Sequence, residues 1–266
     1  MNKPAQLQFT SFGSRSHSPL MLLHGFMGSS KDWHDVLETL AKSYFCIAVD
    51  LPWHGDSPPL RFCDNPFDQT ASALRSILET QHIKKSALLG YSMGGRIAMY
   101  AATRHPNIFG PLIIESASPG IQGIIDLKSR QKQDRIIGDR LRHDNFDYFM
   151  ESWYEQPLFE SLRRHPNFER MHRSRLQNKP AFLADSIRAL GAGVQPSLWN
   201  DIEKYPNSVL MLVGEFDKKY RGIATMLQRR RPQTLIKIIP ECGHNIHFEN
   251  STIFCKKTMQ FLNIKM

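Results

Sequence analysis

Cysteine is scarce in this sequence of 266 residues, which contains four: Cys46, Cys63, Cys242 and Cys255. They form no C-x-x-C pair, and neither they nor the histidines show the paired spacing of a zinc site. In a chain of this size the pattern predicts reduced thiols in a cytoplasmic protein rather than a secreted disulfide framework. We therefore expect no metal site.

Long hydrophobic runs are also missing. The longest, "PLMLL" at 19–23 and "SVLMLVG" at 208–214, are far too short to span a bilayer, so we expect no membrane span. The first 18 residues are polar and have no apolar segment of the kind found in secretory signals, which again favours the cytoplasm.

The formal net charge is +9, but no nucleic-acid-binding signature accompanies it. Lysine and arginine are spread along the chain, with local density at 128–142, 163–175 and 218–231. No G-x-G-x-x-G motif follows a first strand, so no dinucleotide is implied and we expect no cofactor. Nucleic acid is not an expected partner, whereas a small polyanionic substrate would use the excess of positive charge.

Short apolar runs alternate with segments of helical periodicity. Buried strands are predicted at 19–25, 45–50, 86–92, 110–118, 208–217 and 234–244, and amphipathic helices at 29–43, 67–83, 93–106 and 251–262. This alternation predicts an α/β fold with a mostly parallel sheet flanked by helices. The alternation of strands and helices stops at residues 121–205, which contain helix-like segments and no clear apolar strand. We predict a core of residues 1–120 and 206–266 with a helical cap insertion at 121–205.

The sequence "GYSMG" at 90–94 matches G-x-S-x-G between a predicted strand and a predicted helix, which is the context this motif requires. Small residues at 90 and 94 permit a tight turn, so that the Ser92 hydroxyl projects above the edge of the sheet. The Met93 N–H would point at the same place from the helix N-terminus, where negative charge is favoured.

A catalytic serine needs a base, and the base needs a group to orient it. His244 follows the last predicted strand in "CGH", and Asp217 follows the preceding one in "GEFD". The order Ser92, Asp217, His244 is that of the α/β-hydrolases. A second oxyanion-hole donor is expected from the Phe26 N–H in "HGF". We expect His24 and His54 to brace loops, and His247 to pack near the last helix.

The pieces "HGF", "GYSMGG", "GEFD" and "GH" resemble the α/β-hydrolase superfamily across the chain. Together with "ESASPGIQ", "SRQKQDR", "WYEQPLFESL", "HRSR" and "CGHNIHFEN", the sequence is more narrowly similar to the 2-succinyl-6-hydroxy-2,4-cyclohexadiene-1-carboxylate synthases. These enzymes eliminate pyruvate in menaquinone biosynthesis. The resemblance implies the α/β-hydrolase fold and a substrate that carries three carboxylates.

The same resemblance implies a set of substrate-binding residues. Arg96, Arg130 and Arg173 would hold the carboxylates, for which a guanidinium with paired N–H donors is suited. Tyr91 and Trp153 would line the pocket with a hydroxyl or indole donor beside an apolar wall. Without the resemblance, an arginine in the insertion would be interpreted as part of a solvated helix face.

Two departures from the family pattern concern loops at the strand ends. Trp53 stands where many relatives have glycine, and Ala117 with Ser118 stands where "GGHPG" is expected. The second departure leaves the shape of the pocket open.

The implied reaction is a base-initiated elimination in which Ser92, activated by His244 and Asp217, removes a ring proton. The same triad could serve a serine hydrolase, either a carboxylesterase or a C–C bond hydrolase, of a small anionic substrate, and the sequence does not separate base from nucleophile. A non-catalytic binding protein on this scaffold is a further alternative, which an intact triad disfavours. We expect a monomer or a weak homo-oligomer.

Overall fold

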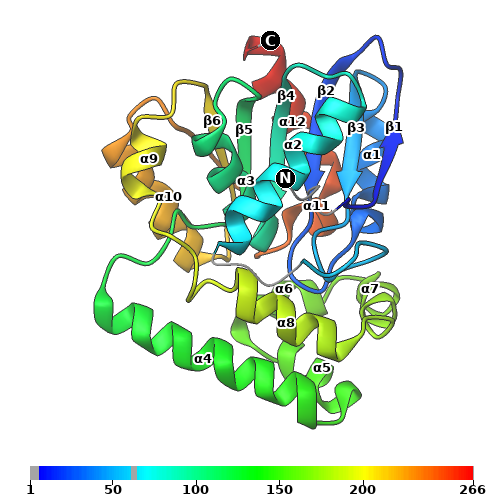
Figure 1. The fold of residues 1–266 in the computed structure, drawn as a ribbon, viewed down its shortest axis with the longest axis vertical. Helices are drawn as coiled ribbons and strands as arrows, with labels where there is room; N and C mark the ends of the chain where they lie inside the picture. The colour runs from blue at the N-terminus through cyan, green and yellow to red at the C-terminus, as the bar shows by residue number, and fades with distance from the viewer. Residues whose placement is uncertain (1–5, 61–64, 266) are drawn as a thin grey trace.

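The computed structural model describes residues 6–60 and 65–265, and its centre is a seven-stranded sheet (Figure 1). The strand order is β1-β3-β2-β4-β5-β6-β7, in which β1 runs antiparallel to β3 and every other neighbouring pair is parallel. The strands are β1 (Phe9–Phe12), β2 (Ser18–Leu23), β3 (Tyr44–Val49), β4 (Ser86–Tyr91), β5 (Phe109–Glu115), β6 (Val209–Gly214) and β7 (Leu235–Ile239).

The predicted mostly parallel sheet is confirmed, and each predicted strand overlaps an observed one. One observed strand, β1, was not predicted from the sequence. Its four residues are exposed or half-buried, so no run of buried apolar residues marks it. It forms one edge of the sheet, where a short and largely solvated strand is common.

Two hydrophobic layers cover the sheet. Helices α2 (Pro66–Thr80), α3 (Met93–Arg104) and α10 (Lys218–Arg230) pack on one face, and α1 (His34–Leu40) and α12 (Ser251–Lys265) pack on the other. A one-turn 3-10 helix, η1 (Ser30–Trp33), precedes α1, and the short α11 (Ile246–Glu249) precedes α12. Because strands β2–β6 are covered on both sides, they read as continuous apolar runs.

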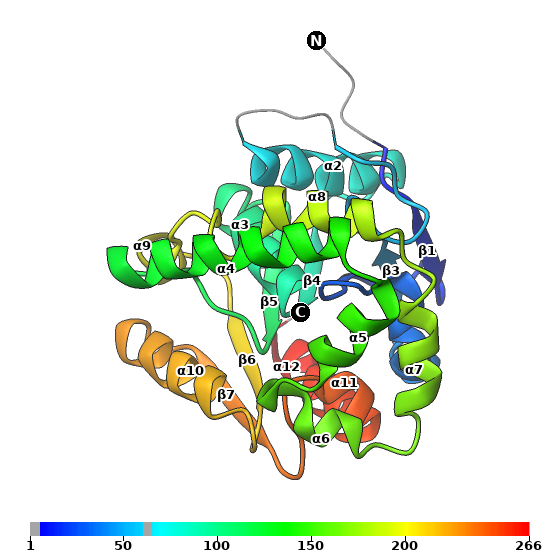
Figure 2. The same ribbon diagram turned by 90° about the horizontal axis from the view of Figure 1, so that it is seen from below.

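Between β5 and β6 the chain is helical throughout. The elements are α4 (Ile124–His143), α5 (Phe146–Tyr154), η2 (Pro157–Phe159), α6 (Glu160–Arg163), α7 (Phe168–Arg175), α8 (Pro180–Leu190) and α9 (Trp199–Glu203). Helices α4 to α8 lie together beyond one end of the sheet, as both views show (Figures 1 and 2). They share a hydrophobic cluster of their own that includes Phe149, Tyr154 and Leu183.

Helix α9 lies apart from that layer. Leu198, Trp199 and Ile202 pack into the core cluster on the α3 face of the sheet, together with Tyr205. Among the described residues, no helix is long and apolar enough to cross a membrane. Cys46, Cys242 and Cys255 are buried and free of disulfides, while Cys63 lies outside the described residues.

Candidate active site

The turn between β4 and α3 exposes the Ser92 hydroxyl. Ser92 has φ 49° and ψ −107°, a left-handed conformation that costs a non-glycine residue free energy and is typical of functional turns. Gly94 makes this possible, because a Cβ there would lie 2.1 Å from the backbone oxygen of Leu23. The Ser92 N–H donates to the backbone oxygen of Glu115 over 2.9 Å, which ties the turn to the end of β5.

Ser92, His244 and Asp217 are joined by hydrogen bonds. His244 Nε2 lies 3.0 Å from Ser92 Oγ, and His244 Nδ1 lies 2.8 Å from Asp217 Oδ2. The His244 and Asp217 side chains are almost fully buried. The second oxygen of Asp217 accepts from the Tyr220 N–H at the start of α10, which fixes the carboxylate. This arrangement holds the imidazole so that Nε2 can take a proton from the serine.

The loop after β2 lies next to Ser92. A Cβ placed on Gly25 would be 2.6 Å from the ring of Tyr91 and 3.6 Å from Ser92 Cβ, so only glycine permits this approach. Gly25 accepts from the Gly28 N–H over 3.0 Å, which closes a tight turn around Phe26. The loop after β2 therefore makes its tight turn beside Ser92, where the Phe26 and Met93 amides are predicted to form an oxyanion hole.

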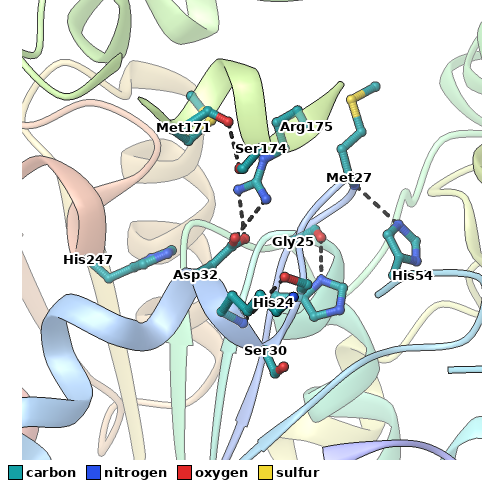
Figure 3. Close-up of polar contacts among 12 residues, drawn as sticks. His24, Gly25, Met27, Ser30, Asp32, His54, Met171, Ser174, Arg175 and His247 are labelled. Carbon is teal, nitrogen blue, oxygen red and sulfur yellow. Dashed lines mark hydrogen bonds and ion pairs between the residues drawn. The ribbon is translucent and has the colours of Figure 1, made fainter. Parts of the chain in front are cut away.

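Two buried histidines hold this loop, as predicted. His24 Nδ1 lies 2.7 Å from the Gly25 oxygen, and its Nε2 accepts from the Leu51 N–H. His54 Nε2 accepts from the Met27 N–H over 3.2 Å (Figure 3). Burial lowers the pKa of His24, and burial followed by the neighbouring His24 lowers the pKa of His54 to about 3. Both rings stay neutral near neutral pH and serve as fixed hydrogen-bonding groups.

Aromatic side chains connect the α4–α8 layer to the triad. The half-buried Trp153 has its ring centroid 5.5 Å from that of Phe26 and 6.1 Å from that of Phe159. The ring centroid of Phe159 is in turn 6.1 Å from that of His244. The Tyr91 ring lies 5.4 Å from that of His244. Tyr91 and Phe159 thus lie next to His244, and Trp153 reaches it through Phe159; Phe159 was not identified from the sequence.

Arg96 of α3 and Arg130 of α4 lie within electrostatic reach of each other. Arg96 Nη1 donates to the Leu190 oxygen over 2.8 Å, and Arg130 Nε pairs with Asp134 over 2.7 Å. Burial, followed by the positive charge of Arg130, lowers the pKa of Arg96 to about 10. Burial and then Arg130 likewise lower the pKa of Lys219. The positive charge of Arg130 therefore opposes the charges of both Arg96 and Lys219, and a bound anion would relieve that repulsion.

Tyr220 connects these cations to the triad. Its ring lies 4.9 Å from that of His244. Burial raises the pKa of its hydroxyl, and the positive charges of Arg96 and Arg130 act against that rise, which places all three groups near one another. Tyr220 and Lys219 follow Asp217 directly in "DKKY", so the motif "GEFDKKYR" held the signal that could have identified them.

Arg173 makes no contact with the triad residues or with Arg96 and Arg130 in the described structure. It is exposed on α7, and within the described part of the chain no hydrogen bond, ion pair or ring contact involves it. Residues two positions apart on a helix point to nearly opposite sides, and it is Arg175 that is buried. Of the two arginines in "HRSR", the structure therefore buries the last one, and the predicted role of Arg173 remains a prediction.

Arg175 forms a buried ion pair with Asp32. Its two terminal nitrogens each donate to one Asp32 oxygen over 2.7 Å, and the pair joins α7 to η1 (Figure 3). A hollow of about 740 Å³ opens beside it, and none of the three triad residues lines that hollow. Among the described residues there is no group of three side chains that could hold a metal ion.

The departures noted in the sequence have local structural explanations. Trp53 has φ 64°, the left-handed region that favours glycine, which is consistent with the glycine expected there from the family pattern. Its ring packs in the core and is 3% exposed, so burial of a large side chain offsets the strain. Ala117 is buried, and the Ser118 hydroxyl accepts from the Gly120 N–H, which makes this a rigid loop.

Comparison with known proteins gives consistent results. Residues 18–251 match the family described as having the alpha/beta hydrolase fold. The chain is 33% identical to a 2-succinyl-6-hydroxy-2,4-cyclohexadiene-1-carboxylate synthase of Enterobacter sp. (strain 638), with 93% of this chain and 92% of that protein covered. It is 34% identical to the synthase of Escherichia coli O1:K1, covering 87% and 88%.

The solved structure of MenH from S. aureus superposes with a TM-score of 0.89 at 31% identity, covering 96% of this chain and 97% of that one. A thermophilic esterase from Thermogutta terrifontis superposes with a TM-score of 0.81 at 23% identity, covering 97% and 93%. The second likeness shows the fold alone.

Proposed function

This chain belongs to the α/β-hydrolase family and, within it, to the 2-succinyl-6-hydroxy-2,4-cyclohexadiene-1-carboxylate synthases, and on that basis we propose that it is a pyruvate-eliminating lyase of menaquinone biosynthesis. Its substrate is 2-succinyl-5-enolpyruvyl-6-hydroxy-3-cyclohexene-1-carboxylate. The observation that carries the proposal is the complete Ser92–His244–Asp217 chain beside a cluster of mutually repelling cations.

The reaction starts with removal of the proton at ring C2, which is acidified by the neighbouring succinyl ketone. Ser92 Oγ takes this proton while passing its own to His244 Nε2, and Asp217 stabilises the imidazolium. The electron pair forms C2=C3, the C3=C4 double bond shifts to C4=C5, and the C5–O bond breaks. The released enolate takes up a proton and becomes pyruvate, so no acyl-enzyme is needed.

Negative charge develops on the succinyl ketone oxygen during proton removal. We assign its stabilisation to the Phe26 and Met93 amides, which the tight turns around Gly25 and Ser92 direct toward one place. Such preorganised donors stabilise the transition state more than the ground state, because the oxygen carries its charge only there. Neutral His24 and His54 hold the Phe26 loop in position.

The carboxylates of the substrate require cations. We propose that Arg96 and Arg130 bind them, with Tyr91 and Trp153 lining the pocket and helices α4 to α8 of the insertion 121–205 covering it as a cap. The like charges of Arg96, Arg130 and Lys219 support this assignment, because only Arg130 has an acidic partner in the described structure.

One chain suffices for this function, because the triad and both arginines come from the same polypeptide. The three free, buried cysteines of the described chain and the charged substrate are in keeping with a cytoplasmic enzyme.

The decisive experiment measures pyruvate release from the substrate by purified protein, alongside the Ser92→Ala variant. We expect release far above the uncatalysed rate in the wild type and a collapse in the variant. A serine hydrolase would instead cleave a simple aryl ester and release no pyruvate. That outcome would overturn the lyase proposal, since the same triad geometry serves acyl transfer.

A further inference from the structure

Glu115 contacts both halves of the catalytic apparatus. It is the last residue of β5 and is fully buried. Its backbone oxygen accepts from the Ser92 N–H over 2.9 Å. Its carboxylate accepts from the His247 N–H over 3.0 Å and from His247 Nδ1 over 2.7 Å. One residue therefore links the serine turn to the loop that carries His244.

The His247 ring is enclosed on several sides. It lies 4.3 Å from the Trp33 ring and 4.9 Å from the Tyr91 ring, and its edge meets Phe254 of α12 at 5.8 Å. The close-up shows it beside Asp32 (Figure 3). The His247 ring cannot turn without disturbing these contacts. The Glu115 carboxylate holds both this ring, through Nδ1, and the backbone N–H of residue 247.

The other side of the His244 loop is held by a second acid. Glu249 Oε2 accepts from the Gly243 N–H over 2.9 Å, and Oε1 accepts from the Asn245 N–H over 3.2 Å. These contacts lie within the loop itself. Among the described residues, Glu115, 132 residues before His247, makes the side-chain hydrogen bonds that connect the loop to the strand that also supports Ser92.

We propose that Glu115 is a positioning residue: through its main chain and its carboxylate it sets the distance between Ser92 Oγ and His244 Nε2. The inference rests on the proposed catalytic use of those two residues. A misplacement of about 1 Å in a catalytic group can cost about a hundredfold in rate. The effect of losing the contact should therefore appear in kcat rather than in substrate affinity.

The test replaces Glu115 with glutamine, which keeps the volume but removes the charge that accepts from both His247 donors. We expect kcat for pyruvate release to fall about tenfold or more, with KM within about threefold. His247→Asn, which can present an amide donor near Nδ1, should retain more of kcat than His247→Leu. Equal losses in these two variants would contradict the positioning role.

Arg231→Gln is the matched control. Arg231 is equally buried and donates to the Tyr205 and Asn207 oxygens, at the opposite end of β6 from the triad. It should lower the melting temperature and leave kcat unchanged. If Glu115→Gln loses stability to the same degree but keeps kcat, Glu115 is only structural and the inference fails.

A second readout is independent of the natural substrate. The rate at which an alkyl fluorophosphonate modifies Ser92 depends on the serine–histidine pair and the oxyanion-hole donors, and not on the cations proposed to bind the substrate; it should fall in Glu115→Gln but not in Arg231→Gln. A wild type that is modified but releases no pyruvate would overturn the proposed function and not this inference. Equal modification rates in wild type and Glu115→Gln would overturn the inference and not the function.

Discussion

Arg96 Nη1 donates a hydrogen bond to the Leu190 backbone oxygen over 2.8 Å, joining the first turn of α3 to the last residue of α8. The contact joins an arginine of the α/β core to α8 of the helical layer α4–α8. Burial, followed by the positive charge of Arg130 on α4, lowers the pKa of Arg96 to about 10. Two cations from separate parts of the chain thus lie within electrostatic reach of each other and of Tyr220, whose ring is next to His244.

Removing either end of the triad should abolish most of the activity. Ser92→Ala removes the proposed base, and Asp217→Asn leaves His244 without the carboxylate that selects its tautomer. Each change should lower kcat by about a hundredfold or more. Steady-state pyruvate release and a melting curve for each variant distinguish lost chemistry from lost folding. Near-normal kcat in a folded Ser92→Ala protein would refute the serine mechanism.

Arg130→Ala should weaken substrate binding. A hydrogen bond to a charged group contributes about 1.5–3 kcal/mol, so KM should rise by about 10- to 100-fold with a smaller change in kcat. Arg135→Ala, an exposed arginine of the same helix, is the matched control. Unchanged KM in Arg130→Ala would remove this residue from the proposed site.

Arg173→Ala should leave both kcat and KM within about twofold of the wild type, since surface substitutions away from partners have small effects. The exposed position on α7 is the reason for this expectation. A large rise in KM would mean that α7 turns Arg173 inward when substrate binds, contrary to its place in this structure.

High salt should slow the enzyme at low substrate concentration. The Debye length falls from about 10 Å at 0.1 M to about 3 Å at 1 M ionic strength, so attraction between the cations and a trianion is screened. We expect kcat/KM to fall and kcat to change little. A kcat/KM independent of salt, measured with sodium chloride, would argue against electrostatic steering.

Asp32→Asn should destabilise the fold, because it leaves the buried Arg175 charge without its partner. The expected loss is about 3–5 kcal/mol in the free energy of unfolding. Asp35→Asn is the control, since the Asp35–Arg170 pair joins the same two regions but is largely exposed and should contribute about 0–1 kcal/mol. Urea unfolding of both variants at neutral pH measures the difference.

The same ion pair predicts a pH dependence. Burial raises the pKa of Asp32, but Arg175 outweighs burial, and the net pKa lies below the usual 3.8. A carboxyl group whose pKa is lower in the folded state stabilises the fold fully above its unfolded pKa and loses that effect as the pH falls through the folded pKa. The stability gap between wild type and Asp32→Asn should be constant above about pH 4 and shrink below it. A gap that widens in acid would contradict this assignment.

Local patterns were sufficient to predict much of this protein. The strand runs, the "GYSMG" turn and the positions of Asp217 and His244 after their strands follow from neighbouring residues, because the carboxyl ends of parallel strands share one edge of a sheet. The triad geometry could therefore be predicted before any contact was seen. The exposed strand β1 could not, because its pairing with β3 leaves no apolar signature.

Tertiary packing alone decided which of two arginines in "HRSR" is buried, because the inward face of α7 depends on where its neighbours lie rather than on its periodicity. It also decided that Glu115 meets His247 across 132 residues and that Tyr220 links the triad to Arg96 and Arg130. Interactions between residues close in sequence determined the Ser92 turn and the strands, and they made His244 the candidate base. The partners of buried charges depend on long-range contacts, and only the folded chain brings those groups together.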